Sequence, residues 1–223
     1  EWGFNEAIGR LVIKGKGPIE DYKDGTKTCK IKDYSDEVPW QERYKEQIKS
    51  VVVCYGISAI DNIAFYDCSS IQSVVIPDGV RSINIGVFSK CKKLTRIFIP
   101  ASVEYMGYNP FAFCKRLKAI EIAKGNQHFK VVEGVIFDKE MECLLSGSVC
   151  TASKYTVPGT VKCITQFAFS GCSQLKSITI PRSVVLIDFH AFEACFTLKT
   201  VSIPRSLDYP PNAFPSGAKI SKY

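Results

Sequence analysis

Leu175-Lys-Ser-Ile178-Thr-Ile180-Pro181 is the stretch that decides the fold. The same order of residue types returns 23 positions later, in residues 198–204, and it occurs upstream in residues 71–77 and 94–100. A fixed period of roughly 20 to 30 residues is typical of a solenoid, in which each repeat forms one coil and stacks on its neighbours. The sequence therefore predicts a solenoid with one short strand per coil.

One apolar residue near the end of each predicted strand aligns the coils. These anchors are Val53, Ile76, Ile99, Ile122, Val157, Ile180 and Ile203, and every interval is 23 residues except the 35 between Ile122 and Val157. Twelve positions beyond an anchor comes a phenylalanine: Phe65, Phe88, Phe111, Phe169 or Phe192. We expect the anchors and these rings to fill the interior, with the rings offset from coil to coil as aromatic packing prefers.

The 12 extra residues of the long interval have a pattern of their own. Residues 132–147 contain two apolar runs around a charged turn, which is typical of a β-hairpin. The hairpin interrupts the spiral, and it either projects from the solenoid or caps a bend. Insertions in repeat proteins often carry function, so both a structural and a functional role stay open here.

Residues 1–47 do not fit the repeat and are predicted to form an N-terminal cap on a solenoid of residues 48–223. We expect a strand over 11–13 and a short helix over 41–49, and a separate binding module is the alternative. A closing coil is predicted for about 204–223. The chain begins at Glu1 without a basic and then apolar leader, and we read it as a mature form or a fragment. Four aromatic residues are suitable to cover the first coil: Trp2, Phe4, Tyr34 and Trp40.

Ten cysteines are many for 223 residues, and five of them recur at one position of the repeat: Cys68, Cys91, Cys114, Cys172 and Cys195. Each cysteine of this column comes three residues after a phenylalanine of the Phe column, and its side chain should point inward. Stacked residues lie about 4.8 Å apart with parallel side chains, so buried free thiols are favoured over disulfides. Metal binding is disfavoured, since there is no Cys-x-x-Cys pair and only two histidines. The pattern does not decide whether a disulfide forms between two of the cysteines outside the column: Cys29, Cys54, Cys143, Cys150 and Cys163.

The outward positions of the repeated strands form the candidate binding site. Strand alternation leaves about three positions per strand facing away from the core, and most carry lysine or hydroxyl side chains. We hypothesise that this face meets an acidic protein or polysaccharide, with one aromatic residue as a small anchor. The alternative is a solubilising face without a partner. The candidate residues are Arg96, Phe98, Lys118, Glu121, Lys154, Lys176 and Lys199.

Several other function classes are disfavoured. The net charge is +7, but the basic residues are scattered through the repeats rather than gathered in one run, and few aromatics accompany them, which argues against a nucleic-acid site. His128 and His190 have no paired nucleophile at a recognisable motif, and no phosphate-binding loop is present, so no catalytic residue and no cofactor is predicted. No run approaches the ~18 apolar residues of a membrane span.

The run Leu-x-x-Ile-x-Ile-Pro-x-Ser-Val-x-x-Ile-x-x-x-Ala-Phe-x-x-Cys resembles the BspA-type leucine-rich repeats of bacterial and protozoan surface proteins. The match is clearest in residues 175–198 and covers almost the whole chain, with Trp2, Pro39-Trp40 and the Glu133–Phe137 hairpin segment also similar to that family. The resemblance implies a right-handed leucine-rich repeat solenoid with a concave sheet. It also implies a cell-surface or secreted protein that binds an extracellular protein or polysaccharide, often as an adhesin. A structural spacer within a larger surface protein is the other function that we consider.

Overall fold

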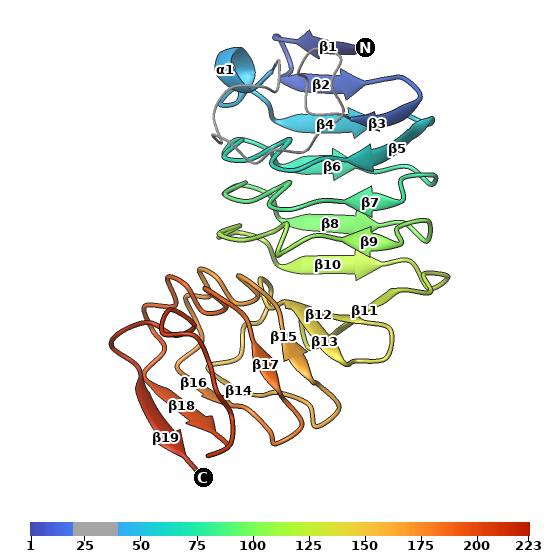
Figure 1. Cartoon of the computed structure of the whole chain (residues 1–223). Coiled ribbons are helices and arrows are strands. Elements are labelled where there is room, and N and C mark those ends of the chain that lie inside the picture. The colour runs from blue at the N-terminus through green and yellow to red at the C-terminus, as the bar shows by residue number, and fades with distance from the viewer. Residues whose placement is uncertain (20–39) are drawn as a thin grey trace.

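The computed structural model describes residues 1–19 and 40–223 as a stack of coils with almost no helix (Figure 1). This confirms the predicted solenoid. Tyr34 and Cys29 lie outside the described residues.

The predicted strands run parallel to their neighbours in three sheets, which we together call the anchor ladder. It comprises β2 (Arg10–Ile13), β4 (Ser50–Val53), β6 (Ser73–Val75), β8 (Arg96–Ile99) and β10 (Ala119–Ile122), and then β14 (Lys154–Thr156), β16 (Ser177–Thr179), β18 (Thr200–Ile203) and β19 (Lys219–Lys222). In the two paired segments β8–β10 and β16–β18, residues 23 apart lie directly opposite each other, as Arg96 and Ala119 do. The 23-residue period of the sequence therefore equals the offset between paired residues of neighbouring strands.

Most coils also have a second short strand, which the sequence did not predict outside the hairpin. These strands form the second ladder, composed of β3 (Gly17–Ile19), β5 (Ile57–Ile60), β7 (Ser82–Ile83) and β9 (Tyr105–Met106), and later of β13 (Cys143–Ser146), β15 (Cys163–Ile164) and β17 (Leu186–Ile187). Several are only two residues long, too short to show the alternation by which a strand is recognised in a sequence. Their inward residues, such as Ile83 and Ile164, were expected in the core and are fully buried.

The predicted hairpin is present, with a third strand added. β12 (Val135–Asp138) pairs antiparallel with β13 around the charged turn, and β11 (Phe129–Val132) pairs with the other edge of β12. β13 also pairs in parallel with β15, so the hairpin is built into the second ladder and does not project from it. The strands above and below it run in different directions, so the hairpin lies at a bend between two stacks of coils (Figure 1).

The core consists of two clusters, one in each stack. All five phenylalanines of the predicted column are fully buried, and neighbouring rings stack with centroids 5.4 Å apart for Phe65–Phe88 and 5.0 Å apart for Phe169–Phe192. Of the anchors, Ile122 is only half-buried, because the chain leaves the regular repeat directly after it. Because each phenylalanine ring stacks with an offset on the ring of the next coil, the same residue type can fill the core of successive coils.

The first residues of the chain extend the same architecture. β1 (Trp2–Asn5) pairs antiparallel with β2, and β2 pairs in register with β4. The expected helix is a single turn, α1 (Gln41–Tyr44), shorter than the predicted 41–49. Trp40, only 1% exposed, stacks on Phe65 with ring centroids 5.7 Å apart and so begins the aromatic column.

Candidate binding face

All seven candidate residues are exposed on or beside the anchor ladder. On β8, Arg96 and Phe98 face outward while Ile97 and Ile99 are buried. This alternation follows from the pleat of a strand, which sends successive side chains to opposite faces. Exposure alone does not make the seven residues one site, because the bend divides them into two groups.

The first group lies on β8 and β10 and carries mixed charge. The register places Glu121 opposite Phe98, and the Arg96 Nε lies 4.0 Å from the Glu121 Oε1. Both charged side chains are more than half exposed, so this ion pair contributes at most about 1 kcal/mol to stability. Its consequence for binding is that the Arg96 charge is partly compensated on the surface itself.

An apolar row crosses the same stack beside this ion pair. Val52 lies opposite Val75 in the β4–β6 pair, and Phe98 follows at the same position of the repeat. Val75 is 54% exposed and Phe98 is 51% exposed, whereas Val52 is half-buried. Phe98 therefore belongs to an exposed apolar row with Val75.

The second group is uniformly basic. Lys154 lies on β14, and Lys176 and Lys199 directly precede β16 and β18. The backbone N–H of Lys199 donates to the carbonyl oxygen of Lys176 at 2.9 Å, so these two lysines occupy the same place in adjacent coils, about 4.8 Å apart.

The structure adds a fourth lysine that sequence reasoning missed. Lys219 on β19 is exposed and lies opposite Thr200, as Lys154 lies opposite Ser177, so these two lysines hold the coil position that directly follows that of Lys176 and Lys199. The interval from Thr200 to Lys219 is 19 residues instead of 23, so the repeat pattern does not reveal it. We call Lys154, Lys176, Lys199 and Lys219 the basic ladder. Residues 153–157, 176–180, 199–203 and 218–222 contain no Asp or Glu, so no carboxylate on these strands compensates it.

The cysteine column is a structural feature of the interior. The Cys91 thiol donates to the Phe65 carbonyl oxygen at 3.3 Å, and the Cys114 thiol donates to the equivalent oxygen of Phe88 at 3.0 Å. Burial raises the pKa of Cys68 and of Cys114 to about 12. These thiols stay protonated at neutral pH, and a neutral thiol is a poor nucleophile and metal ligand. Within residues 1–19 and 40–223, no group of three or more metal-ligating side chains comes together.

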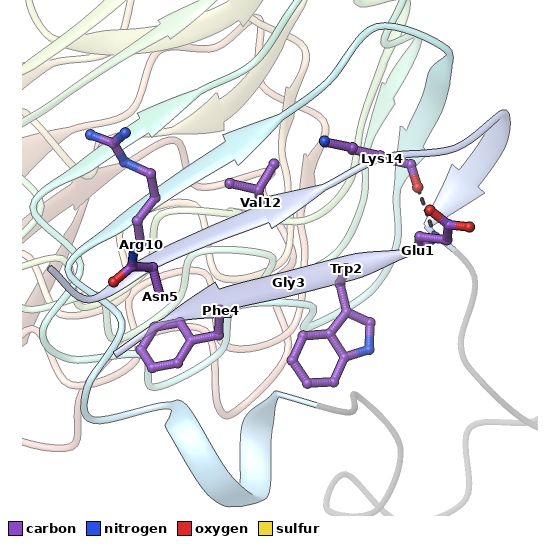
Figure 2. Close-up of a pocket in the computed structure, with 8 residues that line it drawn as sticks. All are labelled: Glu1, Trp2, Gly3, Phe4, Asn5, Arg10, Val12 and Lys14. Atoms are coloured by element: carbon purple, nitrogen blue, oxygen red, sulfur yellow. Dashed lines mark hydrogen bonds between the residues drawn. The ribbon is translucent and has the colours of Figure 1, made fainter. Parts of the chain in front are cut away.

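Two surface hollows are also present, and the first lies at the β2 end of the anchor ladder. One, of about 420 Å³, lies along β1 and β2, where Trp2 and Phe4 extend to one side of β1 and Arg10 and Val12 belong to the neighbouring strand (Figure 2). The other, of about 590 Å³, lies beside the hairpin turn, and there Lys162 Nζ pairs with Glu142 Oε1 at 2.5 Å. Neither hollow contains a histidine or a cysteine among its lining residues.

The fold and the repeat define a leucine-rich repeat protein. The chain belongs to the BspA-type leucine-rich repeat family, whose model matches residues 43–138 and 147–222 in six copies. The unmatched residues between these ranges are the hairpin turn and β13. No curated protein sequence matches the chain.

Solved structures are similar in fold. A leucine-rich repeat protein from Eubacterium ventriosum is 22% identical with a TM-score of 0.54, over 97% of this chain and 73% of that one. A leucine-rich cell surface protein from Faecalibacterium prausnitzii is 20% identical with a TM-score of 0.47, over 97% of this chain and 84% of that one. In the part of this chain that the structure describes, no helix is long and apolar enough to cross a membrane.

Proposed function

We propose that this protein is a non-catalytic binding module that recognises an acidic protein or polysaccharide through the outward face of the anchor ladder. The observation that carries the proposal is the basic ladder, four lysines on successive coils without a carboxylate on the same strands. A cell-surface or secreted location fits this role. The family supports it, as does the similar Faecalibacterium prausnitzii structure, which is described as a cell surface protein.

The spacing of the charges favours an extended anionic partner. Neighbouring coils repeat at about 4.8 Å, well within the ~8 Å Debye length at physiological salt, so the positive potentials of the lysines add along the row. A single acidic side chain would neutralise only one of them, whereas a chain with repeated carboxylates or sulfates neutralises several at once. Such attraction increases the rate of encounter and selects against basic partners.

The first stack supplies an anchor of a different kind. Phe98 and Val75 form the exposed apolar row, with Arg96 and Lys118 beside it. An aromatic side chain at the centre of a contact contributes more to affinity than the charges at its rim. In this proposal the basic ladder sets the charge preference of the protein, and Phe98 adds affinity for partners that reach across the bend.

A spacer without its own ligand is the second candidate function. The ion pair between Arg96 and Glu121 favours it, because mutually compensated charges on a solvated face need no partner. The basic ladder has no such compensation on its strands, so the two candidates make different predictions for that face.

The experiment is a binding panel with the full chain. Immobilised heparin, hyaluronan and poly-glutamate serve as anionic probes and dextran as the neutral control. The binding proposal predicts saturable retention on at least one anionic probe. This retention should weaken as salt is raised from 50 to 500 mM, because salt screens exposed charges by shortening the Debye length, which falls to about 3 Å at 1 M. Equal, negligible retention on all four probes would instead support the spacer.

A further inference from the structure

Two cysteines outside the buried column lie side by side on the second ladder. Cys143 on β13 and Cys163 on β15 are direct partners in the parallel pairing of these strands. Their neighbours Leu144 and Ile164 are fully buried, so strand alternation turns both thiols toward the outer surface, where both are half-buried. Within the described residues both are free thiols.

The surroundings distinguish this pair from the column. The two thiols are close enough for each to affect the pKa of the other. The charged groups that act on them come from three sides: Asp138 and Glu142 from the hairpin turn, Lys162 from the residue before β15, and Asp188 from the coil that follows. By contrast, the column thiols are buried in the interior and donate to backbone carbonyls. The surface pair is therefore both adjacent and accessible to a small reagent.

We propose that Cys143 and Cys163 form a redox-modifiable dithiol that closes to a disulfide in exchange with small disulfides of the oxidised glutathione class. In the first step the Cys143 thiolate attacks one sulfur of the reagent, forming a mixed disulfide and releasing one thiol molecule. The Cys163 sulfur then displaces the second thiol molecule and forms the Cys143–Cys163 bond. The protein loses two protons and two electrons, and the reagent takes them up as two thiols. This inference is independent of the proposed binding function.

The geometry makes the disulfide reversible. Paired residues on parallel strands have Cα atoms about 4.8 Å apart, within the range for disulfides, but their Cβ atoms point in parallel instead of converging to the usual ~3.8 Å. Closing the bond costs strain, and a strained, accessible disulfide is reduced more easily than a structural one. The pair is therefore a reversible redox site, not a permanent cross-link.

The local environment sets the pH dependence of the exchange. Burial raises the pKa of both thiols, that of Cys163 to about 12, and Asp138 raises both further, whereas Lys162 lowers the pKa of Cys143. Because Lys162 favours the Cys143 thiolate, we assign the first attack to Cys143. Because both pKa values are raised, the exchange is slow at neutral pH and accelerates as the solution becomes more alkaline.

The position of the bond gives it a structural consequence. β13 is the last strand of the inserted hairpin, and β15 belongs to the stack that follows the bend. The disulfide joins these two elements covalently. Oxidation is expected to protect the hairpin turn and β13 from amide hydrogen exchange, with little change in the first stack.

The test uses the full chain equilibrated in glutathione buffers of graded redox poise at pH 8, then alkylated and mapped by mass spectrometry. We expect a peptide linked through Cys143 and Cys163, lost in Cys143→Ser and in Cys163→Ser and retained in the matched control Cys54→Ser. Each single variant should accumulate the glutathione mixed disulfide on its remaining thiol. Half-conversion should occur at a more oxidising poise than for a structural disulfide. Absence of the linked peptide under the most oxidising buffer, or preferential linkage of either cysteine to Cys29, would overturn the proposal.

Discussion

The side-chain amide nitrogen of Asn109 lies 2.6 Å from the carbonyl oxygen of Phe167, a residue 58 positions further along the chain. Asn109 is 1% exposed, and its Oδ1 accepts hydrogen bonds from the hydroxyls of Ser146 at 2.7 Å and Ser148 at 2.8 Å. One buried amide therefore connects the first stack, the end of the hairpin and the second stack.

The amide replaces part of a backbone ladder. Elsewhere a phenylalanine N–H reaches the next coil, as from Phe88 to the Pro110 oxygen at 2.8 Å. At the junction, the N–H of Gly147 occupies the equivalent oxygen of Ala168 at 2.7 Å. The neighbouring carbonyl oxygen, that of Phe167, accepts a hydrogen bond from the Asn109 side chain instead. The hairpin can therefore be inserted between the two stacks without leaving buried polar groups unpaired.

We predict that Asn109→Ala lowers the free energy of unfolding by about 1–3 kcal/mol, because the Phe167 carbonyl and two hydroxyls each lose one hydrogen-bond partner in the interior. Asn109→Asp should cost more, since a buried carboxylate would face two carbonyl oxygens. Urea denaturation measures both. The matched control is Asn212→Ala at an exposed asparagine, expected within about 0.5 kcal/mol of wild type. Equal effects at positions 109 and 212 would contradict the bridging role.

Trp40 provides a second prediction, which tests whether residues 1–47 act as a cap. Its indole N–H donates to the Ala64 carbonyl oxygen at 2.9 Å, and its ring stacks on Phe65. Trp40→Phe keeps the stacking and loses one hydrogen bond, for a cost of about 1 kcal/mol, whereas Trp40→Ala leaves a cavity and costs about 3–5 kcal/mol. Hydrogen exchange in Trp40→Ala should increase first in β2 and β4. Uniform loss of protection across both stacks would argue against a local cap.

The repeat in the sequence predicted the positions that recur in every coil, whereas residues with a role in one coil only became visible in the structure. Phe65, Phe88 and Phe111 recur at intervals of 23 residues, so their inward position followed directly from the period. Asn109 could not be recognised, because its role depends on a contact across the 35-residue interval. Lys219 was missed for a similar reason, since the last coil is four residues short and only strand pairing shows which residue it places in the row.

A third prediction concerns alkaline pH. The pKa of Cys68 and of Cys114 is raised to about 12 in the folded protein, whereas an unfolded cysteine titrates near 8.5. Above this pH the unfolded state releases protons that the folded state keeps, so the free energy of unfolding falls as pH rises, approaching about 1.4 kcal/mol per pH unit for each thiol. The stabilisation is complete below about pH 8 and is lost toward pH 12. Denaturation at pH 8, 8.5 and 9 measures the slope below the range in which unfolded tyrosine, with a pKa near 10, titrates.

The control for this prediction is Cys68→Ala/Cys114→Ala, which removes two of the buried thiols. Its free energy of unfolding should be lower than that of wild type at pH 8 but should depend less steeply on pH. Parallel slopes for the two proteins would show that the column thiols are not the groups responsible.

A fourth prediction uses the ion pair on the first stack. Glu121→Gln removes the carboxylate that lies 4.0 Å from Arg96 and should change stability by less than about 1 kcal/mol. If β8 and β10 take part in binding, the freed Arg96 should raise the affinity for heparin and increase its salt dependence. The comparison is Glu104→Gln, which removes the equivalent partner of Arg81 on another part of the first stack, where no change in affinity is expected.

The charge reversal of the basic ladder tests the central claim most directly. Lys154→Glu/Lys176→Glu/Lys199→Glu is compared with Lys14→Glu/Lys16→Glu/Lys124→Glu, three exposed lysines of the first stack whose reversal changes the net charge by the same amount. Affinity for the anionic probe retained best by wild type is measured by calorimetry, with circular dichroism to confirm folding. We predict that the ladder variant loses measurable binding while the control variant stays within about threefold of wild type. Equal affinities of the two variants would contradict the proposal that this face binds the partner.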